Sequence, residues 1–264
     1  MSAEVVRICR YPVKGLSAED LPGADLDAGK AIPHDRRFAL ARPGTEFDPA
    51  NPEWMPKTRF LMLMRDEELA QLRSRFDEHN GYLTIARDGR TVLRARITDP
   101  EGKEELADFF AMFMRNTIGE KPHVVEAPGH TFADAERRPH AATGQYVSIV
   151  NLSSVRALEA FVGMAVDPLR FRANFYVEGW PAWRELDMVG SDLAIGEARL
   201  RVVSRIKRCA ATEVNPTTAE RDVNIPKKLQ VGFGHVFMGL YAEVIAPGRV
   251  EVGDRIRHET QIAH

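Results

Sequence analysis

Cys209 is the residue whose type and setting point most directly to chemistry. It lies just past a predicted strand at residues 200–206, and strand alternation places four cations on its side: Arg199, Arg201, Arg205 and Lys207. Neighbouring cations favour the thiolate, which is the nucleophilic and metal-binding form of cysteine. A cysteine also serves as a small apolar core residue. The local sequence therefore leaves a reactive thiolate and a packed thiol as alternatives.

Other polar residues lie next to predicted turns. Lys14 precedes Gly15, which puts a positive charge where the backbone turns. Arg36 directly precedes a predicted strand, and Arg170, Arg172 and Asn174 cluster around another turn. Each is a candidate for binding an anion, because guanidinium and ammonium groups bind phosphate and carboxylate.

His235 lies in a glycine-rich stretch, residues 231–239, where the backbone can approach a bulky group closely. This stretch lacks the Gly-Lys-Ser/Thr ending of a phosphate-binding loop. The sequence contains neither the His-Glu-x-x-His motif of zinc proteases nor the Gly-x-Ser-x-Gly motif of serine hydrolases. These enzyme classes are therefore not expected.

Composition excludes several further classes. The 264 residues carry a formal charge of -2, which argues against binding to nucleic acid or to an anionic membrane. Two cysteines, Cys9 and Cys209, are too few for an iron–sulfur cluster, a four-cysteine zinc site or a disulfide framework. Cys9 is expected in the core. The hydrophobic runs at 60–64 and 109–114 are far shorter than a membrane span, and no signal segment is seen. We expect a soluble cytoplasmic protein.

The elements that must position these residues are mostly short strands. In the first hundred residues, strands are predicted at 5–13, 37–41 and 60–64. Residues 82–86 and 92–97 flank an Asp-Gly turn, which favours a hairpin.

Two helices are predicted in this half. The first lies between Met64 and Tyr82, because Leu69, Leu72 and Phe76 recur at three- and four-residue spacing. The second covers residues 103–118. An aperiodic segment follows at 126–143 and is predicted to be a long loop, of the kind that often serves function.

The second half reads as mixed α and β structure. Its helix is predicted to begin at Asn151 or Ser153, both good capping residues. Its strands are predicted at 146–150, 174–177 and 200–206, with a closing hairpin of 240–245 and 250–256. Frequent short strands with few helices favour barrels, so we predict a β-rich α+β protein. The expected organisation is a β-barrel-like domain at 1–100, a helix and connecting loop at 101–145, and a second barrel domain at 146–258.

Five ordered blocks resemble one family. They are Tyr11-Pro12-Val13-Lys14-Gly15, Asp35-Arg36-Arg37-Phe38, Arg172-Ala173-Asn174-Phe175, Arg208-Cys209-Ala210-Ala211-Thr212-Glu213-Val214-Asn215-Pro216, and Phe237-Met238-Gly239-Leu240-Tyr241-Ala242-Glu243-Val244. The sequence resembles the MOSC superfamily, named after the C-terminus of molybdenum cofactor sulfurase. It is most similar to the branch that contains the amidoxime-reducing component, in which a MOSC domain packs on an N-terminal β-barrel domain.

The resemblance implies a molybdenum–pterin cofactor, in the molybdopterin form with an undetermined nucleotide extension, and makes Cys209 the molybdenum ligand. Soft metals favour thiolate ligands, so this role suits a cysteine. The residues implied to bind the rest of the cofactor are Lys14, Arg36, Lys57, Arg172, Asn174, Arg208 and Thr212. Asn174 and Thr212 either hydrogen-bond the pterin or order the loop that carries Cys209. The resemblance also brings pyridoxal phosphate binding as a property ascribed to the family.

The activity implied is reduction of N-hydroxylated or N-oxide small molecules. His235 is a candidate proton donor for it. Since the cysteines cannot hold a cluster, electrons are expected from a separate ferredoxin-like or flavin-reductase-like protein. Three positions depart from the family pattern: Gly15, Lys207 and Glu213.

Two alternatives remain at this point. Cys209 could carry sulfur as a persulfide, with no molybdenum bound. The protein could also store or deliver the cofactor without catalysis.

Overall fold

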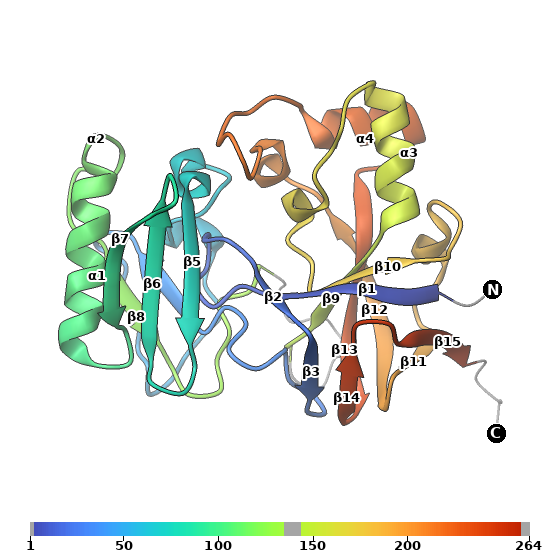
Figure 1. The fold of residues 1–264 in the computed structure, drawn as a ribbon, viewed down its shortest axis with the longest axis horizontal. Helices are drawn as coiled ribbons and strands as arrows, with labels where there is room; N and C mark the ends of the chain where they lie inside the picture. Colours follow the sequence, from blue (N-terminus) through green and yellow to red (C-terminus); the bar gives the residue numbers. More distant parts are fainter. Residues whose placement is uncertain (1–2, 135–143, 260–264) are drawn as a thin grey trace.

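The structure, a computed structural model, describes residues 3–134 and 144–259 and divides into two lobes that lie side by side (Figure 1). The larger lobe is a closed barrel, in which the strands follow the order β10-β9-β13-β12-β11-β15-β1 and β1 pairs with β10 to close the ring. The bounds of these strands are β1 Ala3–Arg10, β9 Val147–Asn151, β10 Phe175–Glu178, β11 Asp192–Ile195, β12 Ala198–Lys207, β13 Phe237–Ala246 and β15 Arg255–Glu259. The predicted β-rich class is confirmed.

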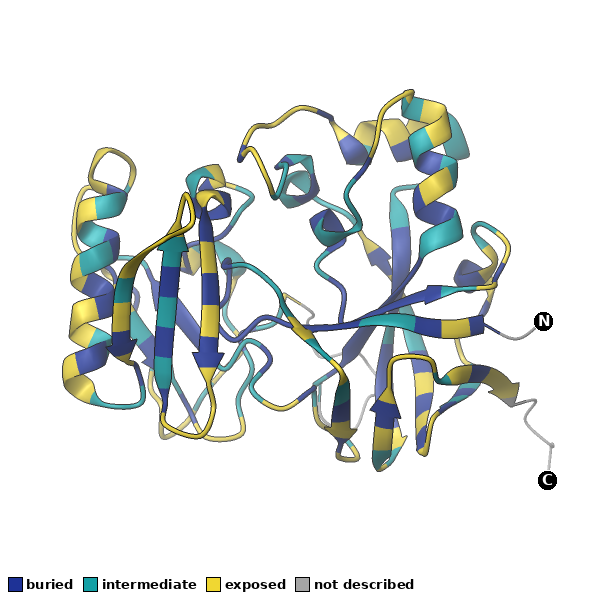
Figure 2. Ribbon diagram, in the orientation of Figure 1, coloured by how far each residue is buried: buried dark blue, intermediate teal, exposed yellow. Residues whose placement is uncertain are grey.

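The barrel is filled by apolar side chains from alternate strand positions. Val5, Ile149, Leu200 and Leu240 are all fully buried in one cluster. Figure 2 shows the resulting alternation of buried and exposed positions along β12. This pattern is the two-residue period that a strand imposes when only one face is covered.

The first strand of the chain belongs to this barrel. β1 pairs with β10 and β15, which come from the second half of the sequence. β2 (Glu19–Leu21) extends the sheet beside β1, and β3 (Gly23–Leu26) pairs with β14 (Gly248–Glu251). The chain therefore starts in the barrel and then crosses to the other lobe, and the crossing segment passes between the lobes.

The smaller lobe combines a three-stranded sheet, a two-stranded sheet and a helix. α1 (Pro100–Phe113) buries Leu106 and Phe110 in the apolar cluster of this lobe. The other elements are β4 Phe38–Ala41, η1 Lys57–Arg59, η2 Glu67–Gln71, β5 Leu72–Asp77, β6 Tyr82–Arg87, β7 Arg90–Arg96, α2 Arg115–Ile118 and β8 His123–Glu126. The predicted hairpin is confirmed, with Asp88 and Gly89 at positive φ in the turn between β6 and β7. The predicted helix at 103–118 is present as α1 and α2.

Two predictions in this lobe are wrong. The expected helix between Met64 and Tyr82 is a short 3-10 turn followed by β5. Leu72, Ser74 and Phe76 are buried and alternate with exposed residues, which is strand periodicity. A four-residue spacing between Leu72 and Phe76 fits both periods, so the apolar residues alone could not separate them. Residues 60–64, expected as a strand, form only a bridge between Phe60 and Ala41 among the described residues.

Helices cover one end of the barrel. α3 (Leu152–Val162) begins at Asn151, whose side chain accepts a hydrogen bond from the Ser153 backbone N–H, as one of the two predicted caps requires. α4 (Ile225–Phe233) lies beside it (Figure 1). Three short 3-10 turns complete this lobe: η3 Pro168–Phe171, η4 Arg184–Asp187 and η5 Ala210–Glu213.

The predicted closing hairpin is wrong, although its strands exist. β13 pairs with β12 and β9, while β14 pairs with β3 and β15 pairs with β11 and β1. Each of these strands has a partner distant in sequence, and no local pattern encodes that choice. Of the predicted loop at 126–143, residues 135–143 lie outside the described part of the chain. Within that part, none of the helices has the length and apolar character needed to span a membrane.

Candidate functional site

A cavity of about 360 Å³ lies between the two lobes. Its walls come from the segment after β1, which includes Lys14 and Gly15, from the loop that contains η1 and from the turn that follows β12. The structure brings to this cavity every predicted site residue except His235: Lys14, Arg36, Lys57, Arg172, Asn174, Arg208, Cys209 and Thr212.

Cys209 is half-buried and stands directly before η5, where the chain leaves β12. The backbone oxygen of Cys209 accepts hydrogen bonds from the Thr212 hydroxyl, at 2.9 Å, and from the Thr212 backbone N–H, at 3.0 Å. Thr212 therefore orders the turn that carries the thiol, which is one of the two roles considered for it.

Arg170 anchors the same turn from the side. Its guanidinium donates to the Glu213 backbone oxygen at 2.9 Å and makes two 2.7 Å hydrogen bonds to the Asp222 carboxylate. The Arg170 side chain is only 1% exposed. Asp222 is exposed but the guanidinium is buried, so loss of the carboxylate would leave a buried charge without its partner, and the doubly hydrogen-bonded pair fixes the geometry of the turn.

The cation nearest to the thiol is Lys57. Its Nζ lies 3.4 Å from Cys209 Sγ and 3.9 Å from a carboxylate oxygen of Asp134. Burial alone would lower the pKa of Lys57, but the Cys209 sulfur and the Asp134 carboxylate outweigh burial and the pKa is raised. Lys57 therefore stays protonated and faces the sulfur as an ammonium.

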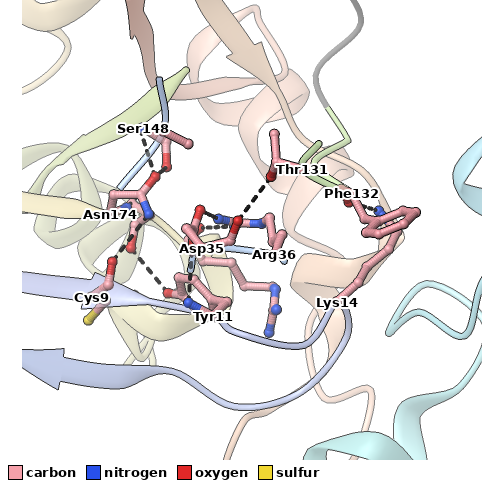
Figure 3. A network of polar contacts seen from close by, with 12 residues as sticks. Cys9, Tyr11, Lys14, Asp35, Arg36, Thr131, Phe132, Ser148 and Asn174 are labelled. Atoms are coloured by element: carbon pink, nitrogen blue, oxygen red, sulfur yellow. Dashed lines mark hydrogen bonds and ion pairs between the residues drawn. The ribbon is translucent and has the colours of Figure 1, made fainter. Parts of the chain in front are cut away.

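Lys14 is more deeply buried than Lys57. Its ammonium donates to the Phe132 backbone oxygen at 2.8 Å (Figure 3). It also forms an ion pair with Asp134. Burial lowers the pKa of Lys14 even though Asp134 acts in the opposite direction. The desolvated ammonium would gain from any further anion at this place.

Two arginines lie over one tyrosine ring beneath the cavity. The guanidinium carbons of Arg36 and Arg172 are 4.7 and 4.3 Å from the centre of the Tyr11 ring. Arg36 forms an ion pair with Asp35 and donates to the Arg172 backbone oxygen at 2.9 Å (Figure 3 shows Arg36, Asp35 and Tyr11). Arg172 donates to the Leu16 backbone oxygen at 2.6 Å and has no carboxylate partner among the described residues.

Arg36 and Arg172 also share a rare backbone conformation. Their φ angles are 51° and 49°, in the left-handed region that non-glycine residues seldom adopt. Such strain is retained where the surrounding structure holds it in place, commonly at ligand sites. Burial lowers the pKa of Arg172 and outweighs the opposite effect of Asp134 and Asp35, which is consistent with a cation that has no carboxylate hydrogen-bonded to it in the described part of the chain.

Arg208 contributes an unsatisfied donor. Its Nε and Nη1 donate to the Met238 and Phe171 backbone oxygens, both at 2.8 Å. Its Nη2 is buried and has no hydrogen-bond partner in the described part of the chain. Burial lowers the pKa of Arg208. A buried unpaired donor at the wall of a cavity fits an anionic or carbonyl-bearing ligand.

The Asn174 side chain is used inside the protein. Its Oδ1 accepts from the Ser148 backbone N–H at 3.0 Å and from the Ser148 hydroxyl at 2.9 Å, and its Nδ2 donates to the Cys9 backbone oxygen at 3.2 Å (Figure 3). Asn174 thus ties together β9, β10 and β1 at the cavity floor.

The structure separates His235 from this cavity. Its ring packs against Trp183, with ring centres 5.0 Å apart, and its Nδ1 accepts from the Phe237 backbone N–H at 3.2 Å. Burial and the nearby Arg205 lower the pKa of His235. The side chain is not among the cavity walls, so the geometry gives no support to proton delivery by this histidine.

The predicted alignment of cations along β12 is only partly correct. Lys207 lines the cavity, whereas Arg199, Arg201 and Arg205 do not. Irregular pairing with β13 interrupts β12 twice between residues 202 and 207, and this breaks the alternation on which the expectation rested.

Sequence reasoning missed four polar residues of the cavity wall. They are Asp134, Tyr146, Ser148 and Tyr241. Asp134 belongs to the long segment after Glu126 that was predicted to be a functional loop, and Tyr241 belongs to the last family-like block. Burial raises the pKa of Tyr241, so its hydroxyl remains a hydrogen-bond donor.

Charge in the cavity is strongly one-sided. One carboxylate, Asp134, faces seven cations among the described lining residues: Lys14, Arg36, Lys57, Arg170, Arg172, Lys207 and Arg208. The described part of the chain also contains no group of three or more His, Cys, Asp or Glu side chains that could hold a metal ion. A metal at Cys209 would therefore have to bring most of its ligands with it, as part of an anionic organic molecule.

Family models match both lobes. The model of the MOSC N-terminal beta barrel domain matches residues 2–120, and the model of the MOSC domain matches residues 136–257. The chain belongs to the MOSC-domain proteins that carry this N-terminal domain, a family associated with molybdenum cofactor binding. The expectation from the sequence blocks is confirmed at this level.

The solved structures found in the comparison are distant from this chain in sequence. The YuaD protein from Bacillus subtilis is 14% identical, with 99% of this chain and 98% of that chain covered and a TM-score of 0.43. YiiM from Geobacillus stearothermophilus is 19% identical, with 44% of this chain and 54% of that chain covered and a TM-score of 0.35. YiiM from Escherichia coli is also 19% identical, with 45% and 56% covered and a TM-score of 0.31. No curated protein matches the sequence significantly.

Proposed function

We propose that this protein is an oxidoreductase that binds a molybdenum–pterin cofactor between its lobes, with Cys209 as the protein ligand of the metal. Its substrates would be N-hydroxylated or N-oxide small molecules. The observation that carries the proposal is the placement of one accessible thiol in a cavity wall that holds seven cations and one carboxylate.

The residues fit such a cofactor chemically. A thiolate is a soft ligand and suits molybdenum. The terminal phosphate of the cofactor needs cations and N–H donors, and Lys14, Arg172 and the unpaired Nη2 of Arg208 supply them. The cofactor form, with or without a nucleotide, stays a prediction, as does pyridoxal phosphate binding.

When bound, the cofactor would supply two-electron chemistry at the metal. The overall reaction converts an N–OH group, two electrons and two protons into N–H and water, with the electrons supplied by a separate electron-donor protein. The protein's own part is positional. Thr212 and Arg170 hold the Cys209 turn, Lys57 places an ammonium 3.4 Å from the sulfur, and the lobes would enclose the organic part of the cofactor.

Metal analysis tests the binding half of this proposal. Protein from molybdate-supplied cells is expected to contain stoichiometric molybdenum and a fluorescent pterin after oxidative release. Cys209→Ala should lose most of the metal. Cys9→Ala is the matched control, because it removes the other thiol, which is fully buried and away from the cavity. Equal molybdenum in Cys209→Ala and the parent protein would remove Cys209 as the ligand.

Activity separates the remaining alternatives. Reduction of benzamidoxime with a chemically reduced viologen is expected for the loaded protein and not for Cys209→Ala. Bound molybdenum without reduction would instead indicate a cofactor carrier. A Cys209 persulfide without molybdenum, detected by mass spectrometry, would indicate a sulfur carrier.

A further inference from the structure

Asp134 places a negative charge in a cavity whose other charged lining residues, among those described, are all Lys or Arg. One oxygen of its carboxylate pairs with Lys14 Nζ, and the other lies 3.9 Å from Lys57 Nζ. The carboxylate thus spans the ammonium groups of Lys14 and Lys57, the second of which also lies 3.4 Å from Cys209 Sγ. A ligand anion bridging Lys14 and Lys57 would need the same space.

The contacts of Asp134 are few. Lys14 is its only hydrogen-bond donor in the described part of the chain, and 45% of its side chain is exposed. Lys14 has a second acceptor, the Phe132 backbone oxygen, at 2.8 Å. The lysine would therefore keep its position if the carboxylate moved away. Other carboxylates near the cavity are tied differently: Asp35 also accepts from the Tyr11 backbone N–H, and Asp222 holds Arg170 with two bonds.

Electrostatics make this carboxylate an obstacle to other anions. Like charges a few ångströms apart repel strongly in a partly desolvated cavity. An entering phosphate group must either accept this repulsion or take over both ammonium groups from Asp134. The Asp134 carboxylate is half-exposed and has one hydrogen-bond donor among the described residues, Lys14. Its displacement by a phosphate group therefore requires only a change of the Asp134 rotamer.

We propose that Asp134 is an internal competitor that sets the affinity of this cavity for anionic groups. In the empty cavity its carboxylate occupies the position between Lys14 and Lys57, and a bound phosphate group displaces it. The inference rests on the proposed function in one respect, that the cavity binds an anionic group.

Inorganic phosphate is a suitable probe, measured by titration calorimetry on the full chain produced in a host that cannot make the pterin. Asp134→Asn keeps the size of the side chain and removes its charge. It should bind phosphate about tenfold more tightly than the parent protein, the change expected when one charged competitor is lost. Asp134→Ser, which also removes the bulk, should behave in the same way.

Asp88→Asn is the matched control. It makes the same change of net charge on an exposed turn, at a positive φ that asparagine tolerates, and should leave phosphate affinity unchanged. The gain from Asp134→Asn should also shrink in a Lys14→Gln background, because the competition requires that lysine.

The outcomes separate the two proposals. Phosphate binding of equal or lower affinity in Asp134→Asn, with an unchanged unfolding temperature, would overturn the role of Asp134 and leave the anion site intact. The role of Asp134 would also be overturned if Asp88→Asn raised phosphate affinity as much as Asp134→Asn does, or if Asp134→Asn gave the same increase in a Lys14→Gln background. Either result would show a general effect of net charge. Absence of phosphate binding in every variant would overturn this inference and the anionic site together, while the molybdenum content of Cys209→Ala would still test the metal ligand alone.

Discussion

The ammonium nitrogen of Lys57 lies 3.4 Å from the sulfur of Cys209, across 152 positions of sequence. Lys57 belongs to the smaller lobe and Cys209 follows a strand of the barrel. The reactive end of the cavity is therefore complete only when the two lobes are packed together. This contact gives a direct way to test whether the cavity works as a unit.

Replacing Lys57 with methionine should slow reactions of the Cys209 thiol. The substitution keeps the length of the side chain and removes the ammonium that stabilises negative charge on the sulfur. Alkylation by iodoacetamide at neutral pH is expected to slow by about threefold to tenfold. Lys30→Met is the control, since Lys30 pairs with Asp27 on an exposed turn. Equal rates in Lys57→Met and the parent protein would show that the contact has no influence on the thiol.

The two cysteines should differ sharply in reactivity. Cys9 is fully buried, and burial raises its pKa to about 12, so it stays a neutral thiol through the usual working range of pH. Cys209 is half-buried and borders the cavity. Mass spectrometry of native protein without cofactor should show one alkylated cysteine, located at residue 209, and a second only after denaturation. Labelling of Cys9 in folded protein would mean that β1 opens readily.

Arg170→Met should destabilise the fold as well as the site. The arginine is 1% exposed and holds Asp222 with two 2.7 Å bonds, so its loss leaves a carboxylate without its partner. Asp222 is an exposed residue that also accepts a hydrogen bond from Asn215 Nδ2, so its carboxylate can be solvated once the guanidinium is gone. We therefore expect a loss of about 1–3 kcal/mol in the free energy of unfolding, from the charged hydrogen bonds of Arg170. Urea denaturation at pH 7 measures the difference.

The effect of Arg170→Met should also depend on pH. Burial acts to raise the pKa of Asp222, but the Arg170 hydrogen bonds prevail and the pKa is lowered from 3.8. A carboxyl group with a lowered pKa in the folded state adds stability above its unfolded pKa, and this stability is lost as the pH falls through the folded value. The difference between Arg170→Met and the parent protein should therefore be full at pH 7 and shrink below about pH 4. A constant difference over this range would exclude the ion pair as its cause.

Short sequence blocks predicted the fold class and named residues that the structure brings together, while their role as a cofactor site stays a prediction. Lys14, Arg36, Arg172 and Cys209 each lie in a block whose order matches the family, and all four line one cavity. Their roles depend on the turns that carry them, and turns are encoded locally. Asp134 could not be predicted from the sequence, because it belongs to no recognisable motif and its contacts are with two lysines distant in sequence, Lys14 and Lys57.

Strand partners were the part of the fold that local patterns could not give. The segment 72–77 has apolar residues four apart, which suits helix and strand equally, and only its burial beside β6 decides the matter. β14 follows β13 closely in sequence but pairs with β3 in a separate two-stranded sheet, more than 200 residues away. In the barrel, β1 pairs with β10 and β15 from the second half of the chain, a choice that comes from closing the barrel, because closure minimises unpaired strand edges.

Gly239 shows how that closure constrains a single position beside the cavity. It has a φ of 80°, and a Cβ there would lie 2.4 Å from the backbone oxygen of Ile149 on β9. Gly239→Ala should therefore force β13 away from β9, and Tyr241, two residues along β13, should shift at the cavity wall. We expect a loss of about 2–4 kcal/mol in the free energy of unfolding from strain and displaced packing.

Gly234→Ala separates these two causes. Gly234 ends α4 with a similar φ of 74°, but a Cβ there meets nothing within 4 Å, so only the backbone strain of about 1 kcal/mol should remain. Denaturant titrations of both variants measure the difference, and phosphate titration should show weakened binding for Gly239→Ala alone. Equal losses of stability in the two alanine variants would mean that β13 and β9 are packed less closely at Gly239 than the 2.4 Å distance implies. Close packing of these two strands would then be excluded as the cause that fixes the position of Tyr241.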